Sequence, residues 1–385
     1  MQKSIPSIVA LSIVVLLALG AGVVVWVLSF QEEQHALTSS IYPRQSQESV
    51  NSQAQNTEIL KVEVRELIGA GWMGIEQLAW SPDGKWLAFV PETRTPQGEN
   101  RLDIRIIPVE GTKEETIENE RGISGFYTHS PAWSPDGKKM AYGTRGGVWI
   151  ANTDGTNAVL LAGQENPNLW DRNLIEGGKS VIDWSPDGNQ IVLVMKDTET
   201  TPYQIWIMDV DGSNLQQLTY DQRDKRNPQF SPDGTRILYE AESKVFVERI
   251  WDYPYESWVM DANGGNRRKL IASGKELKGY TFSSTERSSW SPDGKNILID
   301  EGITWIIASD GIETTLLPYP HAVWGPNGRK LAYAGGGIWI MNSDGTNRIQ
   351  VSKLGGSPIA WSPDGKRIAF VTLQGFDFIY LIEFK

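Results

Sequence analysis

The chain has no cysteine among its 385 residues, only three histidines, and fewer bases than acids. Without cysteine there is no disulfide, thiolate zinc site, iron–sulfur cluster or cysteine nucleophile. His35, His129 and His321 are too few for most histidine-built centres, so we expect no metal site and no cofactor. A net charge of −11 lacks the basic face that phosphate binding needs, which argues against nucleic acid as the main partner.

Glycine, proline and tryptophan are abundant instead: 38, 20 and 16 residues respectively. Glycine and proline supply turns, and tryptophan supplies aromatic bulk for a core. With 40% hydrophobic residues the chain can bury a large core. The composition therefore indicates an all-β protein of many short strands.

The N-terminal region contains an uncharged run from Ile8 to Leu28. As a helix it is long enough to cross a bilayer, and Lys3 before it favours a cytoplasmic N-terminus. We predict an anchor over 1–30, with the rest of the chain extracytoplasmic, in the periplasm or at the cell surface. A cleavable signal peptide and a pilin-like filament helix are the alternatives. Residues 31–56 are rich in Ser, Gln and Asn, and this composition predicts a flexible polar tether.

A short repeat dominates the remainder of the chain. Ser-Pro-Asp-Gly occurs at 81–84, 134–137, 185–188, 231–234, 291–294 and 362–365, and a seventh copy reads Gly-Pro-Asn-Gly at 325–328. An aromatic residue precedes each copy: Trp80, Trp133, Trp184, Phe230, Trp290, Trp324 and Trp361. Proline, aspartate and glycine suit successive positions of a tight turn, and an apolar triplet follows each copy, so each unit starts as a β-hairpin.

A third and a fourth strand complete each unit. Segments such as 147–150, 205–208 and 337–340 carry a central tryptophan and precede a second Asp-Gly turn. Four strands per repeat at intervals of 34 to 60 residues fit a β-propeller blade. We therefore predict a seven-bladed β-propeller of four-stranded antiparallel blades over residues 57–385. Residues 58–67 alternate like a strand without a blade of their own, and we expect them to close the ring in the last blade.

These repeats resemble the WD-like propeller repeats of the TolB family, through Trp-Ser-Pro-Asp-Gly-Lys and the second Asp-Gly turns. The resemblance covers residues 57–385 and implies a propeller that binds protein partners outside the cytoplasm, here on a membrane anchor in place of the TolB N-terminal domain. The same repeat resembles propellers that gate serine peptidases of the prolyl oligopeptidase class, which implies a separate hydrolase domain. The sequence has no Gly-x-Ser-x-Gly elbow.

The candidate contact residues lie in the connections of one rim, which are longer than the turns of the other. Aromatic and charged side chains there are typical of protein interfaces, although the aromatics could equally pin down the loops themselves. The predicted partner-binding residues are Trp170, Arg172, Arg226, Trp251, Asp252, Tyr253, Tyr255 and Arg287. Four residues are predicted to ring the mouth of the axial channel: Glu76, His129, Glu286 and His321.

No acid–base pair or nucleophile can be identified from the sequence, so no catalytic residue is predicted. The expected function is a non-catalytic scaffold that binds a protein, a peptide or an envelope polymer on its loop-rich face. The alternatives are an enzyme or propeller subunit that acts on a peptide or polysaccharide at the channel, and a pilin-like filament subunit.

Overall fold

The computed structural model describes residues 61–385 except 73, 76, 95–99, 103, 111–114, 117–128, 145–146, 164–181, 198–199, 244–254, 271–286, 301–303, 312–313, 318, 320 and 374–376. Contacts divide the chain into two units, Met1–Ile59 and Leu60–Lys385. The predicted anchor and tether, and the first residues of the predicted closing strand, lie outside the described part. Within that part no helix is long and apolar enough to span a membrane.

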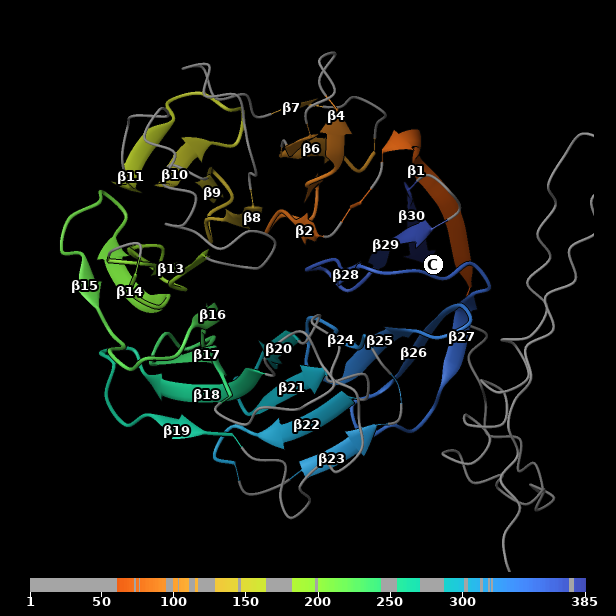
Figure 1. The fold of residues 1–385 in the computed structure, drawn as a ribbon. Helices are drawn as coiled ribbons and strands as arrows, with labels where there is room; N and C mark the ends of the chain where they lie inside the picture. The colour runs from red at the N-terminus through yellow and green to blue at the C-terminus, as the bar shows by residue number, and fades with distance from the viewer. Residues whose placement is uncertain are drawn as a thin grey trace, which may run out of the picture. The chain divides into compact units, whose positions relative to one another are not determined.

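Seven four-stranded antiparallel sheets make up the second unit and surround a common axis (Figure 1). The predicted seven-bladed propeller is thus confirmed. The first three blades, each from the axis outward, are β2 (Leu78–Trp80), β3 (Trp86–Phe89), β6 (Arg105–Pro108) and β7 (Glu115–Thr116); β8 (His129–Trp133), β9 (Lys139–Thr144), β10 (Gly147–Asn152) and β11 (Val159–Gly163); β12 (Ile182–Trp184), β13 (Gln190–Met195), β14 (Gln204–Asp209) and β15 (Gln216–Gln217).

The next three blades repeat the same order. They are β16 (Lys225–Phe230), β17 (Arg236–Glu242), β18 (Tyr255–Asp261) and β19 (Arg268–Lys269); β20 (Arg287–Trp290), β21 (Asn296–Asp300), β22 (Thr304–Ala308) and β23 (Thr314–Leu317); β24 (Val323–Trp324), β25 (Lys330–Ala334), β26 (Ile338–Asn342) and β27 (Ile349–Ser352). A small hairpin of β4 (Glu92–Arg94) and β5 (Asn100–Leu102), which the repeat pattern does not predict, extends the first blade.

The seventh blade joins the two ends of the described chain. It contains β28 (Ile359–Trp361), β29 (Arg367–Leu373) and β30 (Asp377–Phe384), and its outer strand is β1 (Val62–Trp72). β1 pairs with β30 from Val62 opposite Phe384 to Trp72 opposite Asp377. The N-terminal strand therefore lies in the last blade, where the sequence places it, and not in the first.

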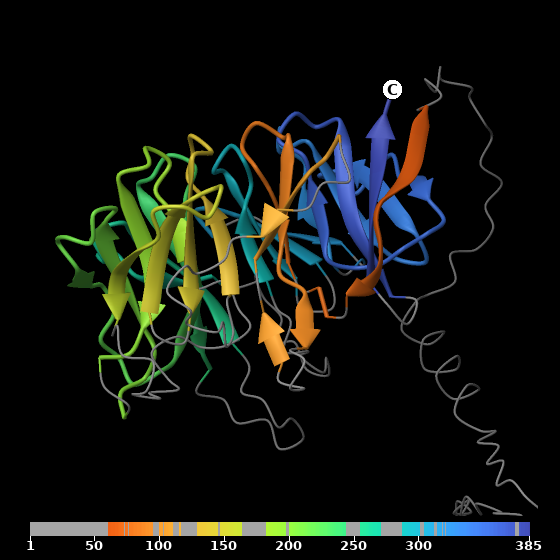
Figure 2. The ribbon, with the colours of Figure 1, turned by 90° about the horizontal axis from the view of Figure 1, so that it is seen from above.

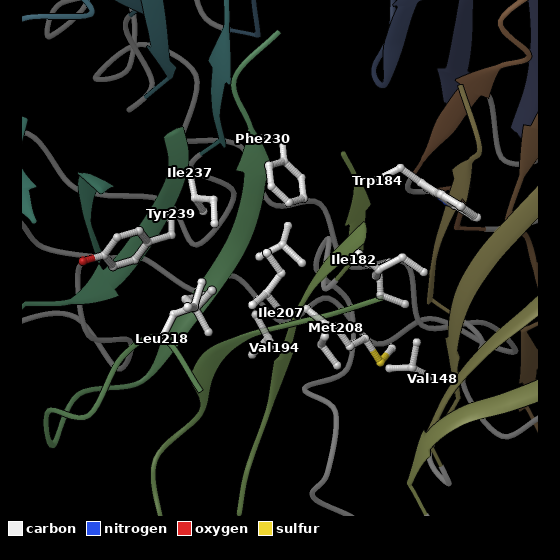
Figure 3. Close-up of a cluster of buried hydrophobic side chains, with 14 of the residues drawn as sticks. Val148, Ile182, Trp184, Val194, Ile207, Met208, Leu218, Phe230, Ile237 and Tyr239 are labelled. Carbon is white, nitrogen blue, oxygen red and sulfur yellow. The ribbon is translucent and has the colours of Figure 1, made fainter. Parts of the chain in front are cut away.

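Each second strand is buried on both faces because it lies between two neighbouring blades. In β3, Leu87 and Phe89 pack in the cluster shared with the seventh blade, while Ala88 between them packs with the second blade. Successive strand residues point to opposite faces, so a continuous apolar triplet fits a strand covered on both sides. Figure 3 shows the equivalent packing between the third and fourth blades, where Ile207 of β14 and Phe230 of β16 belong to one buried cluster.

The two rims of the ring differ. We call the rim that carries the Ser-Pro-Asp-Gly turns and the third-to-fourth strand turns the turn rim; it is uppermost in Figure 2. The opposite rim, here called the loop rim, carries the connections from second to third strand and from each outer strand to the next inner strand. The C-terminal residue Lys385 lies at the turn rim, next to the start of β1.

Candidate functional site

Within the described residues, four of the seven inner-strand aromatics link neighbouring blades by a side-chain hydrogen bond. The indole Nε1 groups of Trp80, Trp133 and Trp184 donate to carbonyl oxygens of the preceding inner strand, namely Ala360, Ala79 and Ala132, at 2.9 to 3.1 Å. Trp290 Nε1 makes a longer bond of 3.4 Å to Gln229. The indole nitrogens of Trp324 and Trp361 are buried without a partner in the described part of the chain.

The Ser-Pro-Asp-Gly turns are structural. In each of the six copies the serine Oγ donates to the aspartate Oδ1, at 2.5 to 2.7 Å, and a backbone N–H two residues later donates to the same oxygen. In the fourth blade the Ser231 hydroxyl, with Thr235, holds the pKa of Asp233 down to about 2. A Cβ built on Gly137, whose φ is +71°, would lie 3.6 Å from Pro82, so each turn also abuts the turn before it.

The residue directly before each aromatic forms a ring around the axis. The seven are Ala79, Ala132, Asp183, Gln229, Ser289, Val323 and Ala360, and every one is partly exposed. An inner strand has a partner on one edge only, so the exposure of these residues indicates that solvent reaches them from the axis. Asp183 is the only ionisable member of this ring.

Asp183 contacts the inner strand of the next blade. Its Oδ2 accepts the backbone N–H of Phe230 at 2.8 Å. Phe230 stands where the other blades have tryptophan, so this seam lacks an indole donor and the carboxyl of Asp183 bridges it instead. Burial raises the pKa of Asp183 to about 7, against the opposing effect of the N–H groups of Phe230 and Trp184.

A buried polar network ties the fourth and fifth blades together at the loop rim. Glu240 of β17 accepts hydrogen bonds from Arg226 Nε at 2.6 Å and from Asn227 Nδ2 at 2.9 Å. It also accepts from the N–H and hydroxyl of Ser288 in β20 at 3.2 Å. Arg226 and Glu240 are 2% exposed, and the Arg226 guanidinium lies 3.5 Å from the ring centre of Tyr255.

The connection into the fourth blade is held by a second set of charges. Lys225 is fully buried, and its Nζ donates to Asp221 Oδ1 at 2.6 Å and to the Arg223 carbonyl at 2.5 Å. Arg223 pairs with the same carboxylate at 3.0 Å. Burial would raise the pKa of Asp221, but the bonds from Arg223 and Lys225 outweigh it and hold the pKa at about 2. Two basic side chains are thus committed to fixing this connection.

A carboxylate–imidazole pair lies between the fifth and sixth blades. The backbone N–H of His321 donates to Asp300 Oδ2 at 2.7 Å, and His321 Nδ1 lies 3.3 Å from the same oxygen. Asp300 is 6% exposed, whereas the His321 side chain is 45% exposed. The φ of His321 is +56°, so its backbone is held in a conformation that few residues adopt.

The structure brings together only some of the predicted contact residues. Arg226 and Tyr255 are in contact, but Arg226 is enclosed by the protein rather than presented to solvent. Arg287 and His129 begin β20 and β8 at the loop rim, and their side chains are outside the described part. The others that lie outside it are Trp170, Arg172, Trp251, Asp252, Tyr253, Glu76 and Glu286. Of the predicted mouth residues, His321 alone has a described side chain.

Sequence reasoning missed Asp183, Glu240 and Asp300. Asp183 could have been found by aligning the repeats, since it is the only acidic residue at its position. Glu240 and Asp300 occupy ends of second strands, where nothing in the repeat marks a partner on the next blade. Among the described residues no group of three or more histidines and acids could hold a metal ion.

No family model matches the chain. It is 27% identical to Dipeptidyl-peptidase 5 of Porphyromonas gingivalis over 54% of its length, and 26% identical to the uncharacterized peptidase YuxL of Bacillus subtilis over 45%. The chain spans 34% and 29% of these two proteins, about a third of each. Both similarities therefore concern one part of a longer protein.

The comparison with solved structures gives a likeness of fold to a lyase and a weaker one to TolB. An oligogalacturonate lyase solved with manganese has a TM-score of 0.60, with 13% identity over 85% of this chain and 96% of that one. TolB of Acinetobacter baumannii has a TM-score of 0.47, with 20% identity over 71% of this chain and 65% of that one. At 13% identity the likeness to the lyase is one of fold alone.

The predicted non-catalytic scaffold is contradicted by these findings, and so is the prediction that the chain is not an enzyme. The two relatives are named as peptidases. The comparisons favour the alternative, a propeller subunit or enzyme. The reasoning erred because the repeat carries information about packing, whereas catalytic groups need not occur in the repeat at all.

Proposed function

We propose that this chain is the propeller part of a peptidase and that it receives peptides at its loop rim. The observation that carries the proposal is the sequence similarity to two relatives named as peptidases, over 54% and 45% of this chain. The sequence has no Gly-x-Ser-x-Gly elbow. In this proposal the nucleophile therefore belongs to a hydrolase part outside these residues, and the propeller admits and orients the peptide.

The hydrogen bonds that hold the described part of the loop rim support this role. The Glu240 network fixes the start of β16 and β20, and Lys225 with Asp221 fixes the connection before β16. A binding surface whose groups are already ordered loses less conformational entropy when a ligand binds.

We further propose that Ile8–Leu28 anchors the protein in a membrane with the propeller on the extracytoplasmic side. Residues 31–56 then act as the tether, and the anchor stands in place of the N-terminal domain of TolB. The uncharged run of the first 30 residues supports this arrangement. It would place the peptidase among peptides outside the cytoplasm.

Peptide binding and partner labelling test the proposal. The full chain is titrated with a library of peptides of four to ten residues, and bound peptides are identified by mass spectrometry. In parallel, the protein is isolated from native membranes and treated with a fluorophosphonate probe for serine hydrolases. We expect peptides to be bound uncut by the chain alone and the probe to label a co-purifying hydrolase part. If the chain bound no peptide and the probe labelled no co-purifying protein, the proposal would be contradicted.

A further inference from the structure

The carboxyl of Asp183 faces the axis of the propeller. Within β16 the N–H of Ser231 bonds outward to Arg236 of the second strand. Successive N–H groups of a strand point to opposite edges, so the N–H of Phe230 points inward. Asp183 Oδ2 accepts this inward N–H at 2.8 Å, which places the carboxyl on the axial side of the inner strands.

This carboxyl has no basic partner within the described residues, where no ion pair includes Asp183. The bases on the strand packed against β12 are Lys225 and Arg226 of β16, and both are committed, to Asp221 and Glu240 respectively. β8 contributes His129, whose side chain is not described. β9 contributes Lys139, which is exposed, and Tyr142, while β13 contributes no ionisable group. An ionised Asp183 therefore attracts a cation from the axis.

The ring around the axis has two unlike sides. Gln229 and Ser289 stand beside Asp183 in consecutive blades and complete a polar side. The remaining four positions, Val323, Ala360, Ala79 and Ala132, form an apolar side. A metal ion needs several ligating side chains, and no group of three or more histidines and acids is present in the described residues. An ammonium on a short aliphatic stem matches both sides of the ring better.

We propose that the axial ring binds a primary ammonium group on an aliphatic stem, with Asp183 as its counter-ion, and that the natural ligand is a peptide with a lysine side chain. The ammonium donates to the carboxylate, and its methylene groups lie along the alanines and Val323. The peptide half of this inference rests on the proposed function. The ammonium half does not, since it follows from the ring alone.

Calorimetric titration of the full chain at pH 8.5 tests the inference, because at that pH an alkylamine is protonated and Asp183 is ionised. The probes are n-pentylamine, its neutral analogue 1-pentanol, and two acetylated hexapeptides that differ only by lysine or norleucine at one position. Asp183→Asn keeps an oxygen acceptor for the Phe230 N–H but removes the charge. Asp224→Asn is the matched control, since Asp224 also accepts a backbone N–H, that of Tyr203, outside the axial ring.

We expect pentylamine to bind the unaltered chain and Asp224→Asn with equal affinity, and Asp183→Asn at least tenfold more weakly. The lysine peptide should exceed the norleucine peptide by a similar factor, and only while Asp183 is present. Equal binding of pentylamine and pentanol, or unchanged amine binding in Asp183→Asn, would overturn the ammonium site. Amine binding without any peptide binding would support the site and contradict the peptide function. Peptide binding that is the same for the lysine and norleucine peptides would support the peptide function and contradict a lysine side chain as the natural ligand of the ring.

Discussion

The phenylalanine at position 230 changes how two neighbouring inner strands are hydrogen-bonded. In the blades before and after it a tryptophan supplies an N–H to the preceding inner strand, at 2.9 Å for Trp184 and 3.4 Å for Trp290. Phenylalanine has no such donor, and at this seam the backbone N–H of Phe230 donates instead to the side-chain carboxyl of Asp183 on the preceding inner strand. The bridge leaves an acid in a poorly solvated place, which raises its pKa to about 7.

Asp183→Asn should stabilise the protein in alkaline solution and not in acid. An acid whose pKa rises on folding, here from 3.8 to about 7, binds its proton more tightly in the folded state. The free energy of unfolding therefore falls as the pH rises through that interval. We expect the variant to gain about 1–2 kcal/mol at pH 8 and almost nothing at pH 4. Urea unfolding at the two pH values measures this, and an equal effect at both would contradict it.

Two tryptophans provide a matched comparison of a satisfied and an unsatisfied indole. Trp133 Nε1 donates to Ala79 at 3.1 Å, whereas Trp361 Nε1 is buried without a partner among the described residues. Both side chains are partly buried, so exchange for phenylalanine removes similar apolar area. We expect Trp133→Phe to cost about 1–2 kcal/mol more stability than Trp361→Phe, from the lost hydrogen bond. Thermal unfolding of both variants measures the two losses of stability. Equal losses would contradict the prediction.

At the scale of elements, the hairpins are predictable from the sequence and the seams between blades are not. Ser-Pro-Asp-Gly specifies its turn locally, through the Ser231–Asp233 hydrogen bond and its equivalents. The position of every first hairpin can therefore be predicted from the repeat. The Glu240 network joins residues 48 positions apart in the chain, and no local pattern marks them. The β4–β5 hairpin is likewise an insertion that the repeat does not encode.

Loss of one partner from the Glu240 network should be more harmful than loss of both charges. Glu240→Ala leaves the guanidinium of Arg226 buried at 2% exposure without its carboxylate. We expect a loss of about 3–5 kcal/mol, because an uncompensated buried charge is costly. The pair Arg226→Met with Glu240→Met should recover most of it. Chemical unfolding of the single and double variants measures the coupling, and additive losses would contradict this account.

At the scale of the whole molecule, the ring closes through strands that are distant in sequence. β1 contributes the outer strand of the seventh blade, and Arg65 of β1 also pairs with Glu383 at 3.2 Å and donates to the Val109 carbonyl of the first blade. The blade count and this closure follow from counting repeats and noticing one strand to spare. For the candidate site, the sequence could predict only which rim carries it. Contacts between blades decide which residues of that rim are exposed to solvent and which are buried.

Removal of the closing strand should open the ring. A chain that lacks residues 1–59 keeps β1 and is expected to unfold in one transition. A chain that lacks residues 1–73 leaves the edge of β30 unpaired, and unpaired strand edges favour association. We expect the shorter chain to lose at least several kcal/mol of stability and to aggregate. Calorimetry and light scattering compare the two, and identical behaviour would contradict the closure described here.

The position at which a peptide binds is the most direct test of the proposed function. Hydrogen–deuterium exchange of the full chain, with and without a bound peptide identified from the library, locates the contact directly. We predict slower exchange at the loop-rim ends of β16, β20 and β24 and around Asp183, with no change in the Ser-Pro-Asp-Gly turns. Protection confined to the turn rim or to the outer strands, with the axial ring unaffected, would contradict a peptide-receiving propeller.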